Sequence, residues 1–272
     1  HVVYGVVGLK THCKCVLVVR QEESGLCRYV HVGTGNYNSK TARTYEDIGL
    51  FTCDEKIGDD VSHLFNSLTG FDKDHDYNSL VVAPRYLRSK IVQLIENEIS
   101  FGKDGHIVMK INGLADARII ELLYQASEAG VRIDLIIRGI CCIRPSSEHE
   151  QNIRIRSVLG RYLEHSRMYH FAHGGQDNGP VYYIGSADMM PRNLDRRVEV
   201  LIPVEHPKHR AWIEEVFATL LADDVVAFEM NREGDWRRVG PAEYVPAHDA
   251  QYRIHLRDSE SQLKLGVPVA EV

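Results

Sequence analysis

An internal repeat constrains this chain more than any other feature of its sequence. One copy combines a His-x-Lys triplet at residues 12–14 with a Gly-Thr-Gly-Asn turn at 33–36. The other combines His-x-Arg at 165–167 with Gly-Ser-Ala-Asp at 185–188. The histidine and the first glycine of the turn are 21 residues apart in the first copy and 20 in the second. Because repeated supersecondary units pack against one another, this spacing predicts two related halves that face one site.

The direction of side chains on a strand gives each triplet a chemical role. Residues two positions apart face the same side of a strand, so His12 points into the site with Lys14, and His165 with Arg167. Two imidazoles, two cations and small-residue turns, whose backbone N–H groups can approach phosphate oxygens, suit phosphoryl transfer. A histidine in such a site can carry the phosphoryl group covalently.

Carboxylates follow both turns at matched distances. Glu46 and Asp47 lie 10 and 11 residues after Asn36, and Glu199 lies 11 residues after Asp188. A carboxylate behind an imidazole fixes its tautomer and raises the basicity of the exposed ring nitrogen. We therefore expect one carboxylate to support each histidine.

The pattern of apolar residues predicts an α/β fold with mixed sheets flanked by helices. Strands at 106–111 and 131–137 enclose a helix at about 115–129, an order typical of a parallel strand pair. The Asp-rich stretch 71–78 is the best linker candidate, so we divide the chain into residues 1–79 and 80–272. The other expected elements are hairpins at 12–33 and 162–186, helices at 84–101 and 207–222, and a peripheral helix or tail over the last 25 residues.

Composition narrows the partners and the compartment. The formal net charge of −6 gives no strongly basic field over the whole chain, so we predict no nucleic-acid partner. Arg192, Arg196 and Arg197 still allow a local basic pocket. The longest apolar run near the start, 16–19, is far too short to span a membrane, and no leader precedes it. We expect a cytoplasmic protein, with peripheral membrane association left open, whose six cysteines are buried thiols.

The paired triplets resemble the two His-x-Lys motifs of the phospholipase-D superfamily. That superfamily places an aspartate five residues after each lysine, and the corresponding positions here are Val19 and Ala172. Longer strings closely resemble the C-terminal half of the polyphosphate kinase family, over residues 1 to about 245. These strings are GLKTHCK, YVHVGTGNYNSKTARTYEDIGLFT, IIRGICCIRP, IRIRSVLGRYLEHSR and GSADMMPRNLDRRVEV.

The resemblance to polyphosphate kinases implies a role for each histidine and its carboxylate. His12 would take the γ-phosphate of ATP and form phosphohistidine. His165 would lie opposite, bind phosphate and act in acid–base catalysis. Asp47 is expected to orient His12, and Glu199 to orient His165.

Binding roles are implied for residues around these four. By resemblance, Tyr45 would stack on the adenine ring and Arg138 would hold nucleotide phosphates. The geometry of the motifs adds Lys14, Arg167 and Arg197 as further cations for phosphate.

The family also implies an architecture, a cofactor and partners. The chain would form two phospholipase-D-like units, of which the first is truncated at its N-terminus. ATP or ADP and inorganic polyphosphate would be the substrates, and the intact protein is expected to be a homo-oligomer. Mg²⁺ would be bound through residues upstream of residue 1, with no metal ligands in this chain. On that basis this chain alone is expected to have weak activity or none.

Two alternatives stay open on sequence grounds. A phosphodiesterase of the phospholipase-D type would hydrolyse diesters without ATP, and the missing aspartates argue against it. A non-catalytic module that binds polyphosphate or a partner chain is compatible with every local motif.

Overall fold

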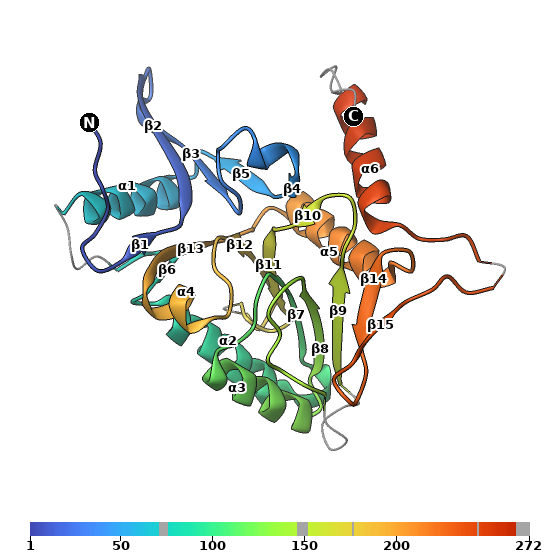
Figure 1. The fold of residues 1–272 in the computed structure, drawn as a ribbon. Coiled ribbons are helices and arrows are strands. Elements are labelled where there is room, and N and C mark those ends of the chain that lie inside the picture. Colours follow the sequence, from blue (N-terminus) through green and yellow to red (C-terminus); the bar gives the residue numbers. More distant parts are fainter. Residues whose placement is uncertain (71–75, 146–151, 176, 244, 265–272) are drawn as a thin grey trace.

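One large mixed sheet contains the hairpin of the second repeat and β1, the short strand just before His12. The computed structural model describes residues 1–70, 76–145, 152–175, 177–243 and 245–264, which form an α/β fold around ten strands (Figure 1). The strand order is β1-β13-β12-β11-β7-β8-β9-β14-β15, and β6 also pairs with β13. Their bounds are β1 (Lys10–Thr11), β6 (Val81–Ala83), β7 (His106–Ile111), β8 (Arg132–Ile137), β9 (Ile153–Val158), β11 (Arg167–Phe171), β12 (Val181–Gly185), β13 (Arg197–Pro203), β14 (Ala227–Met230) and β15 (Trp236–Arg238).

Both faces of this sheet are buried, because successive side chains of its central strands enter different cores. In β8, Ile133, Leu135 and Ile137 pack into the core beneath α2 (Leu87–Phe101) and α3 (Ala117–Glu128). Ile136 packs into the opposite core with α5 (Pro207–Ala222). Each fully buried side chain of this size contributes about 1.5–3 kcal/mol, so the central strands are firmly held.

The first repeat builds a smaller sheet of its own. Its order is β2-β3-β5, with β2 (Lys14–Glu22), β3 (Gly25–Gly33) and β5 (Gly49–Thr52). Helix α1 (Glu55–Thr69) begins after Asp54, whose carboxylate accepts a hydrogen bond from the N–H of Ile57 at 3.0 Å. It ends at Gly70, which has φ +85°. The helix packs its apolar face against the inner side of the sheet.

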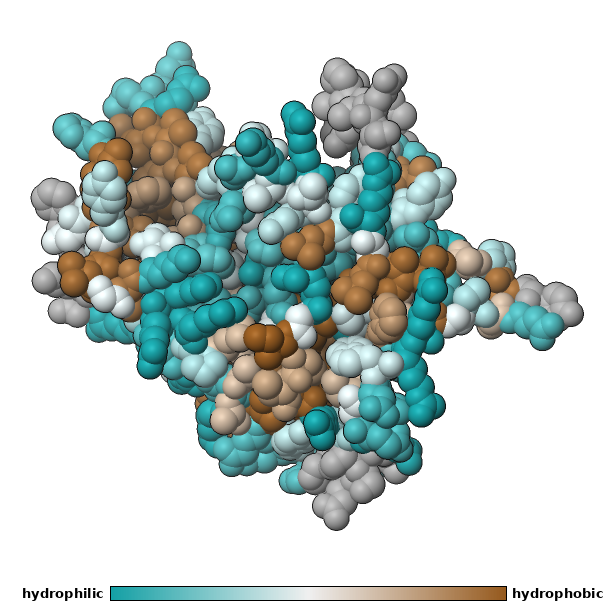
Figure 2. Space-filling view, in the orientation of Figure 1, coloured by the Kyte–Doolittle hydropathy of each residue, from teal (hydrophilic) through white to brown (hydrophobic). Residues whose placement is uncertain are grey.

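The outer side of this small sheet is apolar and open. Figure 2 shows hydrophobic side chains gathered over β2 and β3. The large exposed residues on this side are Val16, Val18, Tyr29 and Phe51. Strands β2 and β5 are both edge strands among the residues that the structure describes.

Short elements connect the two repeats. Strand β4 (Tyr45–Glu46) of the first repeat pairs in parallel with β10 (Leu163–Glu164), which leads directly to the second histidine. β1 likewise joins the first repeat to β13 of the second through a parallel pair. The remaining helices are α4 (Pro191–Asp195), α6 (Ala250–Lys264) and the short turns Thr41–Arg43 and Gly102–Asp104.

Most of the expected elements are confirmed. Both hairpins, the parallel pair β7–β8 with its helix, and the helices near 84–101 and 207–222 are present. Strands β5, β6, β9, β13, β14 and β15 and the short pairing strands β1 and β4 were not predicted from the sequence. The boundary at residue 79 stays a prediction, and residues 71–75 of the expected linker lie outside the described residues. In the part of the chain that the structure describes, no helix has both the length and the apolar character needed to cross a bilayer.

Candidate active site

The two hairpins carry their basic residues in the same register. Lys14 on β2 lies opposite Gly33 on β3, and Arg167 on β11 lies opposite Gly185 on β12. Each basic residue therefore faces the first glycine of its own turn. The repeat seen in the sequence is a repeat of strand pairing.

His12 lies just after β1 and is held by β13. Its backbone N–H donates to the carbonyl of Val198 at 3.0 Å. Its ring Nδ1 lies 2.9 Å from Oε2 of Glu199, a residue with no exposed surface. Ser186 Oγ donates to the same Oε2, and Asn193 Nδ2 donates to the other oxygen at 2.7 Å. A fully hydrogen-bonded carboxylate is thus fixed behind the His12 ring.

His165 is held in the same manner from the other repeat. Its Nδ1 lies 2.8 Å from Oδ1 of Asp47, and Thr34 Oγ1 donates to that oxygen at 2.6 Å. The Thr34 hydroxyl also accepts from the N–H of Ile48 at 2.9 Å. The same arrangement recurs where the N–H of Val200 donates to the Ser186 hydroxyl at 3.2 Å. In both copies the hydroxyl precedes its carboxylate by 13 residues.

The expected pairing of carboxylates and histidines is wrong. Asp47 contacts His165 and not His12, and Glu199 contacts His12 and not His165. The reason is the strand order: β1 pairs with β13, so His12 lies beside Glu199, and β4 pairs with β10, so Asp47 lies beside His165. Each repeat supplies the carboxylate that orients the histidine of the other repeat.

The cations of the two triplets also occupy matching places. Lys14 Nζ donates to the carbonyl of His12, and Arg167 Nη1 donates to the carbonyl of His165 at 2.8 Å. Lys14 is 6% exposed, and burial lowers its pKa to about 8 although Glu199 opposes the shift. Arg167 forms a two-pronged ion pair with Asp188, with both N···O distances at 3.2 Å. Arg167 is thus tied into the turn of its own repeat.

The two rings differ in how their second nitrogen is used. Arg167 Nη1 lies 3.0 Å from Nε2 of His165, and burial, with Arg167 and Lys14 adding to it, lowers the His165 pKa despite Asp47. The His165 ring is therefore neutral near pH 7, with Nδ1–H directed to Asp47. His12 Nε2 makes no hydrogen bond to any residue that the structure describes. Its lone pair is the freer of the two.

The remaining candidate residues surround His165 and Glu199. The Tyr45 ring lies 4.9 Å from the His165 ring, centroid to centroid. Arg138 Nε donates to Asn112 Oδ1 at 3.0 Å, and Asn112 Nδ2 donates to the carbonyl of His165 at 3.0 Å. Arg197 Nη1 is 3.8 Å from Oε1 of Glu199, so it partly neutralises that carboxylate.

Sequence reasoning missed some supporting residues. Asn112 lies outside every motif, and Asn193 lies within GSADMMPRNLDRRVEV but has no role assigned from the sequence. Thr34 and Ser186 were quoted only as turn residues, yet both hydroxyls bind a site carboxylate. Their equal spacing from Asp47 and Glu199 is a signal in the sequence that could have found them.

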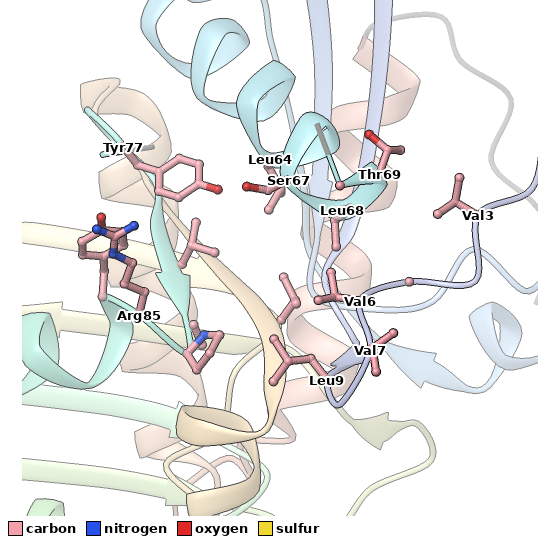
Figure 3. A pocket seen from close by; sticks show the side chains of 17 residues that line it. Val3, Val6, Val7, Leu9, Leu64, Ser67, Leu68, Thr69, Tyr77 and Arg85 are labelled. Atoms are coloured by element: carbon pink, nitrogen blue, oxygen red, sulfur yellow. The ribbon is translucent and has the colours of Figure 1, made fainter. Parts of the chain in front are cut away.

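An apolar hollow near the first repeat lies outside this site. A pocket of about 550 Å³ is enclosed by the N-terminal segment, the end of α1 and the segment around Pro84. Figure 3 shows Val6 and Leu9 of the N-terminal segment on the opposite side of the pocket from Leu64. Neither histidine lines it. The pocket reaches Val198 on the side of β13 opposite to Glu199.

The described residues do not fit a magnesium site. No group of three or more His, Cys, Asp or Glu side chains within them is arranged to hold a metal ion. Asp47 and Glu199 are engaged by imidazoles, and Asp188 is engaged by Arg167. The expected Mg²⁺ therefore has no ligand set here, and the steps proposed below use only this chain's own groups.

Comparison with known proteins decides the family. The model for polyphosphate kinase C-terminal domain 1 matches residues 1–74, and the model for C-terminal domain 2 matches residues 80–251. The chain belongs to the polyphosphate kinase family. It is 52% identical over 246 residues to the polyphosphate kinase of Synechocystis sp., covering 89% of this chain and 33% of that protein. The polyphosphate kinase of Mycobacterium avium is 51% identical over 240 residues, with 87% and 32% covered.

A solved polyphosphate kinase shares the fold. The crystal structure of the enzyme from Porphyromonas gingivalis aligns with a TM-score of 0.85 and 37% identity, over 94% of this chain and 40% of that one. The chain spans about one third of the length of the curated relatives it matches. Membership of the polyphosphate kinase family is thus shown over nearly all of the chain.

Proposed function

We propose that the complete protein containing this chain is a kinase that reversibly transfers the γ-phosphoryl group of ATP to the end of a polyphosphate chain through phosphohistidine at His12. One observation carries the assignment of the nucleophile. The buried carboxylate of Glu199 holds Nδ1 of His12, while Nε2 is left without a hydrogen bond among the described residues. An imidazole oriented in this way offers Nε2 as the nucleophile.

The reaction consists of two displacements at phosphorus. In the first, Nε2 of His12 attacks the γ-phosphorus, an N–P bond forms, the bond to the β–γ bridging oxygen breaks, and ADP leaves. The positive charge that develops on the ring is stabilised by Glu199, as the aspartate of a hydrolase triad stabilises its imidazolium. In the second, a terminal oxygen of polyphosphate attacks, the N–P bond breaks, and the chain grows by one phosphate.

The surrounding cations stabilise the transferring group. Charge on the phosphoryl oxygens is compensated mainly by positioned cations and N–H donors, which Lys14 and Arg138 supply. Arg167 donates toward Nε2 of His165 in the free site. When phosphate enters, the guanidinium donates to phosphate instead, and His165 exchanges protons with it. Tyr45, beside His165, stacks on the adenine ring.

The architecture belongs to the same proposal. Two phospholipase-D-like units are supported by the equal register of the two hairpins and by the exchange of carboxylates between them. Neither copy has a complete site without the other. The expectations of Mg²⁺ dependence and of a homo-oligomer come from the family resemblance.

The decisive test is the location of the phosphate. The complete protein is treated with ATP labelled at the γ-position, and acid-labile label is located by mass spectrometry. We expect label on His12, none in His12→Gln, and label with turnover lowered about 10²–10⁴-fold in His165→Gln. His209→Gln, an exposed histidine on α5, serves as the control. Acid-labile phosphate in the His12→Gln protein would contradict the assignment.

The exchanged carboxylates sharpen this test. Glu199→Gln should act like a weakened His12 variant and slow formation of the phosphoenzyme. Asp47→Asn should act like a weakened His165 variant. If Glu199→Gln instead resembled a His165 variant and Asp47→Asn a His12 variant, the observed contacts between carboxylates and histidines would not control the chemistry.

A further inference from the structure

A buried ammonium group contacts the residues on both sides of His165 and has no part in the proposed reaction. Lys110 on β7 is 2% exposed. Its Nζ lies 2.8 Å from Oε2 of Glu164, 2.6 Å from Oγ of Ser166 and 3.2 Å from the carbonyl of Ser166. It also lies 3.4 Å from Oε2 of Glu46. These partners are the two neighbours of His165 in the chain and the residue that precedes Asp47.

We propose that Lys110 is a positioning residue, which clamps the chain on both sides of His165 and the residue before Asp47 so that this imidazole and this carboxylate meet. The effect of Lys110 on turnover rests on the proposed function, whereas its effect on the position of the His165 ring does not depend on that function.

The backbone contacts explain why a clamp is needed here. The carbonyl of Glu46 accepts from the N–H of both His165, at 3.1 Å, and Ser166, at 2.9 Å. The strands that carry these contacts, β4 and β10, contain two residues each. So short a ladder fixes little by itself, and the side chain of Ser166 reinforces it by donating to Oε2 of Glu46 at 2.7 Å. Lys110 reaches all three residues from the strand below.

A phosphate-binding role does not fit Lys110. An ammonium group has three N–H donors, and the carbonyl and hydroxyl oxygens of Ser166 and Oε2 of Glu46 accept all of them, while Glu164 forms an ion pair with the group. With 2% exposure the group is also out of reach of solvent. Its action on the site is therefore indirect.

The charges of the cluster support the same view. Burial would lower the pKa of Lys110, but Glu164 and Glu46 outweigh it, so the pKa is raised. Burial raises the pKa of Glu46 to about 7, with Glu164 and Asp47 adding to the rise and Lys110 and Ser166 opposing it. The Lys110 ammonium thus lies between the carboxyl groups of Glu164 and Glu46. Removing the ammonium would leave the carboxylates without a cation.

The C-terminal helix holds the cluster from outside. Gln251 on α6 donates from Nε2 to Oε1 of Glu164 at 2.7 Å and to the carbonyl of Tyr162 at 2.8 Å. Its Oε1 accepts from the N–H of Tyr162 at 2.9 Å. Glu164 Oε2 makes no directional hydrogen bond to a described residue, so the ion pair with Lys110 is its compensation. Oε1 of Glu164 is thus hydrogen-bonded by Gln251 of α6, and Oε2 forms the ion pair with Lys110.

The test separates positioning from folding by balancing the charges. Lys110→Met alone leaves buried carboxylates unpaired and should lower the melting temperature. Lys110→Met/Glu164→Gln removes one positive and one negative charge, and should fold with a melting temperature near that of the wild type. In the complete protein we expect this double variant to lose about 10- to 100-fold in kcat, because small misplacements of catalytic groups cost rates of that order. KM for ATP should change little.

A double-mutant cycle identifies the group through which Lys110 acts. If it acts through Asp47 and His165, its effect on kcat should largely vanish in the Asp47→Asn background and persist in full in the Glu199→Gln background. The proposal is overturned if the losses of kcat caused by the Lys110 and Asp47→Asn substitutions multiply as independent effects. It is also overturned if kcat of Lys110→Met/Glu164→Gln stays within about twofold of wild type.

A second readout does not depend on activity. With ¹⁵N-labelled histidine, the downfield proton of His165 Nδ1, bound to Asp47, should be lost in Lys110→Met/Glu164→Gln, while that of His12 is kept. Retention of the His165 signal overturns the proposal even if turnover falls. A wild-type protein that forms no phosphohistidine but loses this signal in the variant would refute the proposed function and leave the positioning role intact.

Discussion

At the scale of single residues, Lys14 shows how burial sets the chemistry of the site. Its ammonium group is held against the carbonyl of His12, and its pKa of about 8 comes mainly from burial. Arg167 at the equivalent position keeps its charge at any pH that the protein tolerates. The two halves of the site thus carry different cations, a lysine and an arginine, at equivalent positions.

This difference predicts a pH dependence. As pH rises through about 8, Lys14 loses its charge, so KM for ATP should rise on the alkaline side. Lys14→Arg should move that rise to higher pH, because the second repeat already accommodates arginine opposite its glycine. The measurement is KM against pH, with the exposed Lys208→Arg as control. An unchanged alkaline limb in Lys14→Arg would exclude Lys14 as its source.

The stability of the folded chain should increase as pH rises through the titration of Lys14, whereas ATP binding should weaken. The folded pKa of Lys14, about 8, lies below the unfolded value of about 10.4. Between these values the unfolded chain binds more protons, so this group makes the free energy of unfolding rise with pH. Urea unfolding of wild type and Lys14→Met over that range isolates the contribution, which should be absent from the variant.

At the scale of elements, the turn after each hairpin is shaped by what lies beside it. A Cβ atom on Gly35 would lie 1.9 Å from Oδ2 of Asp47, closer than any real contact. The glycine is therefore required by the carboxylate and not by the backbone. The turn and the Asp47 carboxylate pack closely together, and the Thr34 hydroxyl binds the same carboxylate.

Gly35→Ala should therefore damage the site more than the fold. Its methyl group displaces the Asp47 carboxylate from His165, and we expect kcat to fall about 10²-fold with a small change in the free energy of unfolding. Gly49→Ala is the matched control, because its Cβ would crowd the ring of His31, at 2.2 Å, outside the site. Equal losses of kcat in both variants would show that the effect is a general disturbance of the small sheet.

At the scale of the whole molecule, the two repeats complete each other. β1 of the first joins the main sheet through β13 of the second, and β4 joins β10. Both histidines are oriented across this contact. The chain as a whole carries a net charge of −6, so the proposed attraction of polyphosphate would depend on the local cations of the site and not on a global field.

Binding of polyphosphate should therefore weaken when salt screens its attraction to the cations of the site. Raising NaCl from about 0.1 M to about 1 M shortens the screening length from about 10 Å to about 3 Å, and KM for polyphosphate should rise. The rate at saturating polyphosphate should change far less. Arg138→Gln should flatten the dependence of KM on salt, and the exposed Lys208→Gln should not. A salt dependence that both variants share with the wild type would place the binding cations elsewhere.

The sequence by itself determined the units of the fold and the composition of the site. The hairpins, the β7–α3–β8 crossover and the helices follow from local alternation and helical spacing, which short stretches of chain express on their own. The same alternation predicted that His12 lies with Lys14 and His165 with Arg167, although both histidines lie just before the strands that begin at Lys14 and Arg167. Spacing marked Glu46, Asp47 and Glu199 as candidate carboxylates, and the choice of Asp47 over Glu46 came from the resemblance to polyphosphate kinases.

Only the tertiary structure decided which carboxylate serves which histidine. His12 and Glu199 are 187 residues apart, and His165 and Asp47 are 118 apart. Their contacts are made by two short parallel pairs, β1–β13 and β4–β10, whose two-residue strands leave almost no periodic signal. The buried Lys110 was equally hidden, because a lysine on an apolar strand reveals its partners only when the strands beside it are known.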